Sequence, residues 1–302
     1  MIDKVVKNIE VIRDEYNLQV DSIFWEQNGF KEVWFNSDEK LHELRSCSKV
    51  LVAMAVGIAI EKKMFTLDTL VYPFLENVVK IKNKNNLKKI KKWTIRDLLT
   101  HTTGYEKQMM STKDIENIKK EELLEYALNY DMPYEVGEHF AYNNVEPFII
   151  AVFFQEKFGI NLKDFINENI FRKMDIKDFK WDDYGKYCPG ATGLYLKHSD
   201  FHKIGKLLLN DGMFDNKKII SEYWINEMCR MQLETPMIYK KDRVLPKAGV
   251  GYYTFISRDG YVFRDGSAGQ YLIINKERKL LISIMSSEKN MNLVTEILRD
   301  LV

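Results

Sequence analysis

Strand-like segments occupy the two ends of this 302-residue chain, whereas helical patterns fill its middle. Near the start, two β-rich segments flank Asn28-Gly29, a dipeptide favoured in two-residue hairpin turns. In the last fifth of the chain the hydrophobic period becomes two, which predicts one hairpin around Asp259-Gly260 and another around residues 275–278. Strands from both ends are most simply joined into one antiparallel sheet, with the helices inserted between them. We therefore expect an α/β fold of the α+β type.

Apolar helices dominate the middle of the chain. The longest apolar run, Val50 to Ile60, is too short to span a bilayer and is typical of a buried helix, which we expect at residues 46–65. A second strongly apolar helix is expected at residues 145–158. Shorter helices are expected from Thr94 to a stop at Gly104 and at 112–130, 162–173, 199–210 and 221–231, with Ser199 and Ser221 as N-caps.

These patterns predict a single domain over residues 1–302 with two subdomains. Residues 1–45 and about 245–302 would form the sheet and two terminal helices that flank it, and residues 46–244 a mainly helical part. The C-terminal helix is expected at about 290–301. The N-terminal helix begins at Asp3 and has an apolar face made of Val5, Ile9, Ile12 and Tyr16.

The charge of the chain argues against several classes of partner. With 45 basic and 44 acidic residues the formal net charge is +1, which gives no reason to expect binding to nucleic acid or to an anionic membrane. A stretch rich in lysine and asparagine at residues 77–93 is interpreted as a solvated loop with short extended pieces. The first 18 residues lack the apolar core of a signal peptide, so we expect a cytoplasmic protein without a membrane span.

Neither the cysteines nor the histidines form a metal-binding pattern. Cys47, Cys188 and Cys229 lack metal-type spacing and are expected to be reduced thiols. Cys47 is a weak candidate nucleophile, because no histidine stands beside it in the sequence. The chain contains neither H-E-x-x-H nor G-x-S-x-G. We therefore expect no metal and no other cofactor.

The pattern S-x-x-K occurs three times, at Ser37, Ser46 and Ser286. Ser37 lies in a polar stretch and Ser286 lies at the end of a strand, but Ser46 and Lys49 open the apolar helix, where positions i and i+3 share one face. Burial and nearby positive charge lower the pKa of a lysine, which is ordinarily about 10.4, and let it accept a serine proton. On this segment alone, a helix that merely carries both residues fits equally well.

Two further segments carry groups that a serine hydrolase requires. Tyr142 and Asn144 stand just before the second apolar helix, although an ordinary packing tyrosine is the alternative for Tyr142. In "FRDGSAGQYLIIN", Gly266 allows a substrate to approach the backbone. The N–H of Ser267 is a candidate oxyanion donor beside that of Ser46.

Taken in order, four stretches resemble the penicillin-recognising serine hydrolases, and among them the class C β-lactamase-like branch with its esterases and D-amino-acid peptidases. "RSCSKVLVAMAVGIAIEKK" is similar to the nucleophile helix of the family. "WTIRDLLTHTTGYE" is similar to its T-I-R-D-L-L-T-H-T-S-G-L stretch, "VGEHFAYNN" to P-G-x-x-F-x-Y-S-N, and "GATGLYLKHSDFHKIGKLLLNDG" to G-G-L-x-S-T-x-x-D-L-x-x-F. The similarity runs from about residue 22 to the end. It implies a β-lactamase/transpeptidase-like fold.

The resemblance implies a role for each matched residue. Ser46 would be the acylated nucleophile, and Lys49 and Tyr142 would share the general-base and general-acid work. Asn144 would hold the amide or ester side chain of the substrate. The backbone N–H groups of Ser46 and Ser267 would form the oxyanion hole.

The third motif of the family, K-T-G or H-x-G, falls on Arg264-Asp265-Gly266 and departs from the pattern. Arginine keeps a positive charge that could bind a carboxylate or bias the lysine and the tyrosine, but it is larger than lysine and cannot give up its proton. Asp265 could pair with Arg264, and it would repel the carboxylate of a penicillin. The departure weakens the expectation of a β-lactamase and leaves acyl transfer in place.

We therefore expect a serine hydrolase that cleaves an ester or amide bond of a small molecule through an acyl-serine intermediate. Within enzymes, the alternative is a weak β-lactamase or a D-aminopeptidase. Outside them, the alternative is a ligand-binding or penicillin-binding protein that is acylated without turnover. The sequence indicates no oligomeric state.

Overall fold

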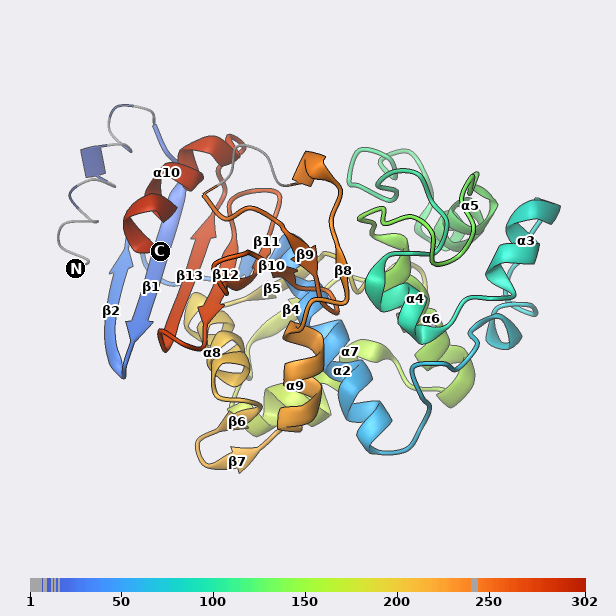
Figure 1. Ribbon diagram of the computed structural model, residues 1–302, viewed down its shortest axis with the longest axis horizontal. Helices are drawn as coiled ribbons and strands as arrows, with labels where there is room; N and C mark the ends of the chain where they lie inside the picture. Colours follow the sequence, from blue (N-terminus) through green and yellow to red (C-terminus); the bar gives the residue numbers. More distant parts are fainter. Residues whose placement is uncertain (1–6, 8–9, 12, 14, 16, 240–243) are drawn as a thin grey trace.

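The structure is a computed structural model that describes every residue except 1–6, 8–9, 12, 14, 16 and 240–243. Its main sheet has eight strands in the order β2-β1-β13-β12-β11-β10-β9-β8, and all neighbours are antiparallel. The strands are β1 (Val20–Gln27), β2 (Phe30–Phe35), β8 (Leu233–Glu234), β9 (Gly249–Val250), β10 (Phe255–Ile256), β11 (Val262–Asp265), β12 (Tyr271–Asn275) and β13 (Leu280–Ser286). Strand β1 from the start of the chain lies beside β13 from its end (Figure 1), so one antiparallel sheet does join both ends.

The three expected hairpins are present. Asn28 and Gly29 have φ angles of 51° and 81°, and the pairing of β1 with β2 continues up to this turn. Positive φ at both central residues matches the twist of the flanking strands, which explains the Asn-Gly choice. The other two hairpins are β10–β11 and β12–β13.

Helices account for most of the region between the strands. They are α2 (Lys49–Glu61), α3 (Lys84–Ile90), α4 (Ile95–Thr100), α5 (Leu123–Asn129), α6 (Val145–Phe158), α7 (Leu162–Ile166), α8 (His198–Leu209), α9 (Glu222–Cys229) and α10 (Met291–Leu301). Short 3-10 turns lie at Arg45–Ser48, Tyr72–Phe74, Lys120–Glu122, Arg172–Met174 and Met237–Tyr239, and a π turn lies at Asn167–Phe171. Two small sheets are formed by β3 (His42–Glu43), β4 (Phe179–Trp181) and β5 (Leu194–Leu196), and by β6 (Met213–Phe214) and β7 (Lys217–Lys218).

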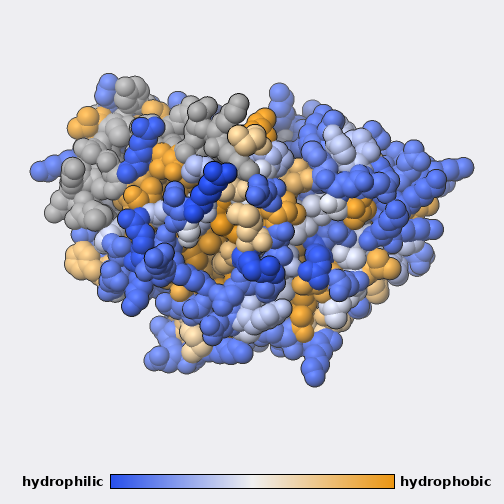
Figure 2. Space-filling model, in the orientation of Figure 1, coloured by the Kyte–Doolittle hydropathy of each residue, from blue (hydrophilic) through white to orange (hydrophobic). Residues whose placement is uncertain are grey.

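The main sheet is covered on both faces, because the side chains of its inner strands alternate between two cores. Ile282 and Ile284 of β13 join the core that contains α10. Leu281 belongs to the other core and reaches α8, where a Cβ on Gly205 would lie 2.4 Å from it. Most of the face seen in Figure 2 is hydrophilic, and hydrophobic residues show mainly toward its middle.

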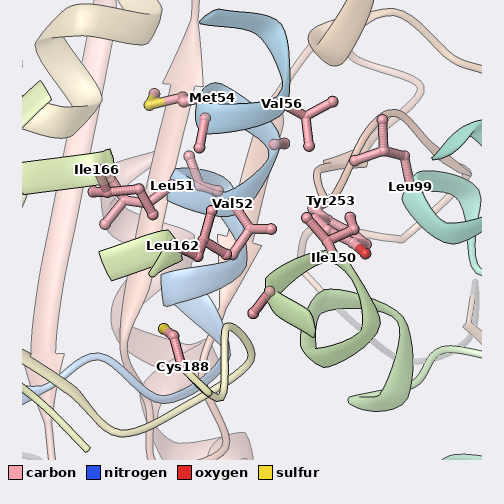
Figure 3. Close-up of a cluster of buried hydrophobic side chains, with 14 of the residues drawn as sticks. Leu51, Val52, Met54, Val56, Leu99, Ile150, Leu162, Ile166, Cys188 and Tyr253 are labelled. Atoms are coloured by element: carbon pink, nitrogen blue, oxygen red, sulfur yellow. The ribbon is translucent and has the colours of Figure 1, made fainter. Parts of the chain in front are cut away.

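Helix α2 is surrounded by other elements, as its uniform apolarity predicts. Every residue from 49 to 59 is buried. Side chains from α4, α6 and α7 close around it (Figure 3). The indole of Trp224 in α9 lies against Gly57 and donates a 3.0 Å hydrogen bond to the Ala53 carbonyl. The helix that begins next to Ser46 is therefore fixed within the molecule.

Residues 77–93 differ from the expected loop. They contain α3, which Asn83 caps by accepting hydrogen bonds from two backbone N–H groups. The helix buries Ile90, and the ammonium of Lys89 is also buried and donates to the Met132 carbonyl. The asparagine cap and the internal carbonyl partner explain why a lysine-rich stretch forms a packed helix.

Several helix ends also differ from expectation. The expected helix at 112–130 is confined to residues 120–129, and the helix after Thr94 stops at Thr100 because His101, in a left-handed conformation, ends it before Gly104. The N-cap of α8 is Lys197 and not Ser199. The capping box at Thr94 and the N-cap at Ser221 are confirmed.

The expected N-terminal helix face, with Asp3 and the four apolar residues that follow it, lies outside the described residues. In the described part of the chain, every helix is too short or too polar to cross a membrane. The molecule has an α+β architecture with a large antiparallel sheet. Its division into two subdomains stays a prediction.

Candidate active site

Ser46 and Lys49 stand where the 3-10 turn Arg45–Ser48 runs into α2. Ser46 is half-buried and Lys49 is fully buried. The Lys49 Nζ atom lies 3.1 Å from Ser46 Oγ. At the other two S-x-x-K positions, Ser37 is exposed, and buried Ser286 donates its hydroxyl hydrogen to a backbone carbonyl of the N-terminal segment. Ser46 thus has both the lysine partner and an accessible position.

The Nζ atom of Lys49 is a meeting point for distant segments. It lies 2.8 Å from the Tyr142 hydroxyl, 2.6 Å from Asn144 Oδ1 and 3.4 Å from the Ala191 carbonyl oxygen. Tyr142 and Asn144 reach it because they immediately precede α6, of which Asn144 is the N-cap. The structure therefore brings together Ser46, Lys49, Tyr142 and Asn144, and the roles that the resemblance implies for them stay predictions.

The side-chain amide of Asn144 is engaged at both ends. Its oxygen accepts from Lys49, and its nitrogen donates a 2.9 Å hydrogen bond to the Met110 carbonyl. Asn144 therefore orients the lysine. That it also holds a substrate stays a prediction.

Arg264 enters the site from β11 and is only 1% exposed. Its Nε donates a 3.1 Å hydrogen bond to the Ser46 carbonyl, and a terminal nitrogen donates to the Tyr142 hydroxyl. The guanidinium carbon also lies 4.7 Å from the centre of the Tyr142 ring and 4.8 Å from that of Phe255. One rigid fork thus connects the candidate nucleophile to the tyrosine.

The expected pairing of Asp265 with Arg264 is wrong. Consecutive strand residues point to opposite faces, and Asp265 turns to Lys247, with the Asp265 Oδ2 and Lys247 Nζ atoms 2.7 Å apart. Both side chains are largely buried, at 13% and 8% exposed. The ammonium of Lys247 thus compensates the negative charge of Asp265, which replaces a small hydroxyl residue in the third motif.

Gly266 and Ser267 form the turn after β11, directly against the segment before Ser46. A Cβ on Gly266 would lie 3.0 Å from the Leu44 carbonyl oxygen, so this close approach favours glycine. Ser267, the next residue, is exposed. The turn therefore places Ser267 at the edge of the site, and the oxyanion hole assigned to the N–H groups of Ser46 and Ser267 stays a prediction.

The two ionisable groups beside Ser46 are shifted in opposite directions. Burial, and then the charge of Arg264, hold the pKa of Lys49 well below its usual range. Burial raises the pKa of Tyr142 to about 12, although Arg264 opposes the shift. Lys49 is therefore neutral more readily than an exposed lysine and can accept a proton, whereas Tyr142 keeps its proton until a stronger base takes it.

Cys47 does not share this environment. Its sulfur points inward, 3.6 Å from the Arg264 carbonyl oxygen, and burial raises the pKa of the thiol. Inert buried thiols have these properties. Within the described residues, no three His, Cys, Asp or Glu side chains are grouped so that they could hold a metal ion.

A comparison with protein families decides the relationship. The family model described as Beta-lactamase matches residues 34–301. This chain belongs to the β-lactamase family. The resemblance seen in the sequence motifs and the expected β-lactamase/transpeptidase-like fold are both confirmed.

Several solved structures have the same fold. The octameric penicillin-binding protein homologue from Pyrococcus abyssi matches with a TM-score of 0.79 at 16% identity, over 99% of this chain and 77% of that one. EstCE1, a hydrolase with promiscuous acyltransferase activity, matches with 0.79 at 14% identity, over 99% and 98%. A mutant of simvastatin synthase from Aspergillus terreus matches with 0.73 at 14% identity, over 99% and 96%. No curated protein matches the chain.

Some contacts of this β-lactamase family member were not anticipated from its sequence. Ala191, whose carbonyl faces Lys49, carries no side-chain signal. Lys247 lies outside the segments that carry the recognised motifs. Glu146 is buried. The available signal in the sequence was an acidic residue within the apolar run "VEPFIIAVFF", because a buried acid requires a partner.

Proposed function

We propose that this β-lactamase family member is a serine hydrolase that cleaves an ester or amide bond of a small molecule, with Ser46 as the nucleophile. The observation that carries the proposal is the buried Nζ atom of Lys49, 3.1 Å from the Ser46 hydroxyl and 2.8 Å from that of Tyr142. A lysine with a lowered pKa, next to a hydroxyl and a second proton carrier, is the arrangement that activates a serine.

In the acylation half, neutral Lys49 takes the hydroxyl proton of Ser46 while Oγ attacks the carbonyl carbon. The carbonyl electron pair moves to the oxygen, where the N–H groups of Ser46 and Ser267 would stabilise the negative charge. Collapse re-forms the C=O bond and breaks the bond to the leaving group. The leaving group takes the phenolic proton of Tyr142, which Lys49 replaces across their 2.8 Å contact. The products are acyl-Ser46 and a free alcohol or amine.

In the deacylation half, water gives a proton to Lys49 and attacks the acyl carbon. Collapse returns the electron pair to Ser46 Oγ, which takes the proton back and releases a carboxylic acid. An alcohol in place of water gives acyl transfer. EstCE1, which has the same fold, is described as a hydrolase with promiscuous acyltransferase activity, and this supports acyl transfer as a second reaction of the acyl-serine intermediate.

The third motif favours esters and simple amides over penicillins as substrates. Arg264 already donates to Ser46 and Tyr142, and Asp265, which is paired with Lys247, stands where a carboxylate-binding hydroxyl would otherwise be. We propose that Asn144, Gly266 and Ser267 contact the acyl part of the substrate.

The proposal is tested by intact mass after incubation with a fluorophosphonate, in which Ser46 Oγ forms a bond to phosphorus and fluoride leaves. One phosphonyl group should appear on the wild type and none on Ser46→Ala. Multiple turnovers of a p-nitrophenyl ester should accompany labelling, because a binding protein would release one equivalent of nitrophenol and stop. Equal labelling of wild type and Ser46→Ala would show that the nucleophile is another residue. An unlabelled wild type would refute the proposed enzymatic activity.

A further inference from the structure

A buried pair of residues, His101 and Glu146, lies behind Tyr142 and is not used in the reaction above. His101 ends α4 and is 3% exposed, and Glu146 lies in the first turn of α6 and is 0% exposed. His101 Nδ1 lies 3.0 Å from Glu146 Oε2. The Thr103 hydroxyl donates to Glu146 Oε1 at 2.6 Å. The carboxylate is thus fixed from two sides.

Of this pair, His101 contacts the tyrosine of the candidate site. The rings of His101 and Tyr142 are 5.2 Å apart, at 61° to each other. The His101 carbonyl accepts a 3.1 Å hydrogen bond from the Ala141 N–H, so the segment that carries Tyr142 is tied to the end of α4. Glu146 follows Asn144 by two residues.

His101 leaves the charge of Glu146 uncompensated. A carboxylate requires Nδ1 as the donor, and the other ring nitrogen, Nε2, is buried without a hydrogen-bond partner among the described residues. Protonating Nε2 would bury a further charge in the same place, which is unfavourable. Burial accordingly lowers the pKa of His101, although Glu146 opposes this. The imidazole of His101 is therefore held toward its neutral form, and it supplies no positive charge to offset the Glu146 carboxylate.

Glu146 is connected to Lys49 through His101 and Tyr142, because His101 packs on the Tyr142 ring and the Tyr142 hydroxyl lies 2.8 Å from Lys49 Nζ. Its negative charge opposes the effects of burial and of Arg264 on the pKa of Lys49. Glu146 raises the pKa of Lys49, whereas burial and the Arg264 guanidinium lower it. In the part of the chain that the structure describes, further titratable or charged groups around this centre are Cys47 from the turn before α2, Tyr105 after α4, Tyr142 before α6, Tyr253 between β9 and β10, and Asp265 on β11. Glu146 is the carboxylate that the structure fixes on the α6 side of the centre.

We propose that Glu146 is a positioning residue of this site, which sets the pH range in which Lys49 can accept the proton of Ser46. The inference rests on the proposed function. Because the carboxylate favours the charged form of Lys49, it keeps the base from becoming active at still lower pH. His101 holds the carboxylate and packs on Tyr142.

The test is the pH dependence of fluorophosphonate labelling of the full chain, measured as a second-order rate from pH 5 to 10. Glu146→Gln removes the charge and keeps an oxygen for His101 to donate to. We expect the acidic limb of its profile to move to lower pH than in the wild type. A profile that superimposes on the wild type overturns the proposal. An unlabelled wild type would instead refute the proposed function, so the two failures are distinguishable.

His101→Asn separates charge from packing. Asparagine tolerates the left-handed backbone at φ 57° and keeps an N–H for Glu146. The acidic limb of the His101→Asn profile should stay at the wild-type pH, even if the labelling rate falls. An equal shift in His101→Asn and Glu146→Gln would show that disturbed packing causes the shift, and would overturn the proposal. Glu26→Gln is the matched control, since Glu26 forms a second His–Glu pair, with His202, between β1 and α8. It should leave the labelling profile unchanged.

Discussion

Arg264 and Ser46 are joined by a 3.1 Å hydrogen bond from the guanidinium Nε to the backbone carbonyl of the serine. The bond connects β11 to the turn before α2, across 218 positions of sequence. The same guanidinium donates to Tyr142. The sheet therefore fixes both the candidate nucleophile and its proton carrier.

Replacing Arg264 by lysine should weaken ester hydrolysis. A lysine has one donor group where arginine has a planar fork, so it cannot bond Ser46 and Tyr142 in the same geometry. Loss of one charge-assisted hydrogen bond costs about 1.5–3 kcal/mol, so kcat/KM should fall roughly 10- to 100-fold. Arg258→Lys, at an exposed position, is the control. Equal rates for wild type and Arg264→Lys would contradict this account.

Lys49→Met should change how stability depends on pH. The folded wild type holds a lysine of lowered pKa, whereas the unfolded chain binds its proton up to about pH 10.4. Below that pH the unfolded state binds more protons, so wild-type stability relative to the variant must decrease as the pH falls. Urea unfolding at pH 9.5 and pH 7 measures the difference. Lys62→Met, at an exposed lysine, should show no such trend, and the prediction fails if both variants behave alike.

Gly57→Ala should destabilise the protein, although alanine usually stabilises a helix by about 1 kcal/mol relative to glycine. A Cβ at this position would lie 2.1 Å from Trp224 Cδ1, so the indole has to move. Overpacking of this kind costs about 1–3 kcal/mol. Thermal unfolding of Gly57→Ala and of the double variant Gly57→Ala with Trp224→Leu measures this loss of stability. Leucine is smaller than tryptophan, so the double variant should recover part of it. A raised Tm for the single variant would show that the contact is loose.

Lys247 and Asp265 should be strongly coupled, because both side chains are largely buried. A double-mutant cycle with Lys247→Met and Asp265→Asn should give a coupling of about 1–3 kcal/mol in the free energy of unfolding. The pair Arg172 and Glu168 provides the comparison, since its atoms are 2.6 Å apart but both side chains are about two-thirds exposed. That cycle should give about 0.5 kcal/mol or less. Similar couplings in the two cycles would mean that burial does not strengthen the inner pair.

Short sequence motifs correctly predicted the turns and helix caps whose stabilising contacts lie within a few residues of one another. Asn28-Gly29 specifies its own turn, and the capping box at Thr94 forms within four residues. The ends of the helix expected at 112–130 and the start of α8 were placed less well. Packing in the folded state sets such ends, and capping residues such as Ser199 are only one contribution to them.

The candidate site was predicted as a set of residues but not as a geometry. Ser46 with Lys49 and Tyr142 with Asn144 each form a short pattern that can be recognised along the chain. The sequence suggested that Asp265 would pair with its neighbour Arg264, whereas the alternation of β11 turns it toward Lys247. The contact of Glu146 with His101 joins positions 45 residues apart and leaves no local pattern.

By itself, the sequence determined the family, the sheet built from both ends of the chain, and the residues gathered around Ser46, because motifs and hydrophobic periods are local properties. Only the tertiary structure decided which charges face one another: Arg264 toward Ser46 and Tyr142, Asp265 toward Lys247, and the carboxylate of Glu146 toward His101. The physical reason is that desolvation and Coulomb interactions depend on distances between elements that are remote in sequence, and packing alone fixes those distances.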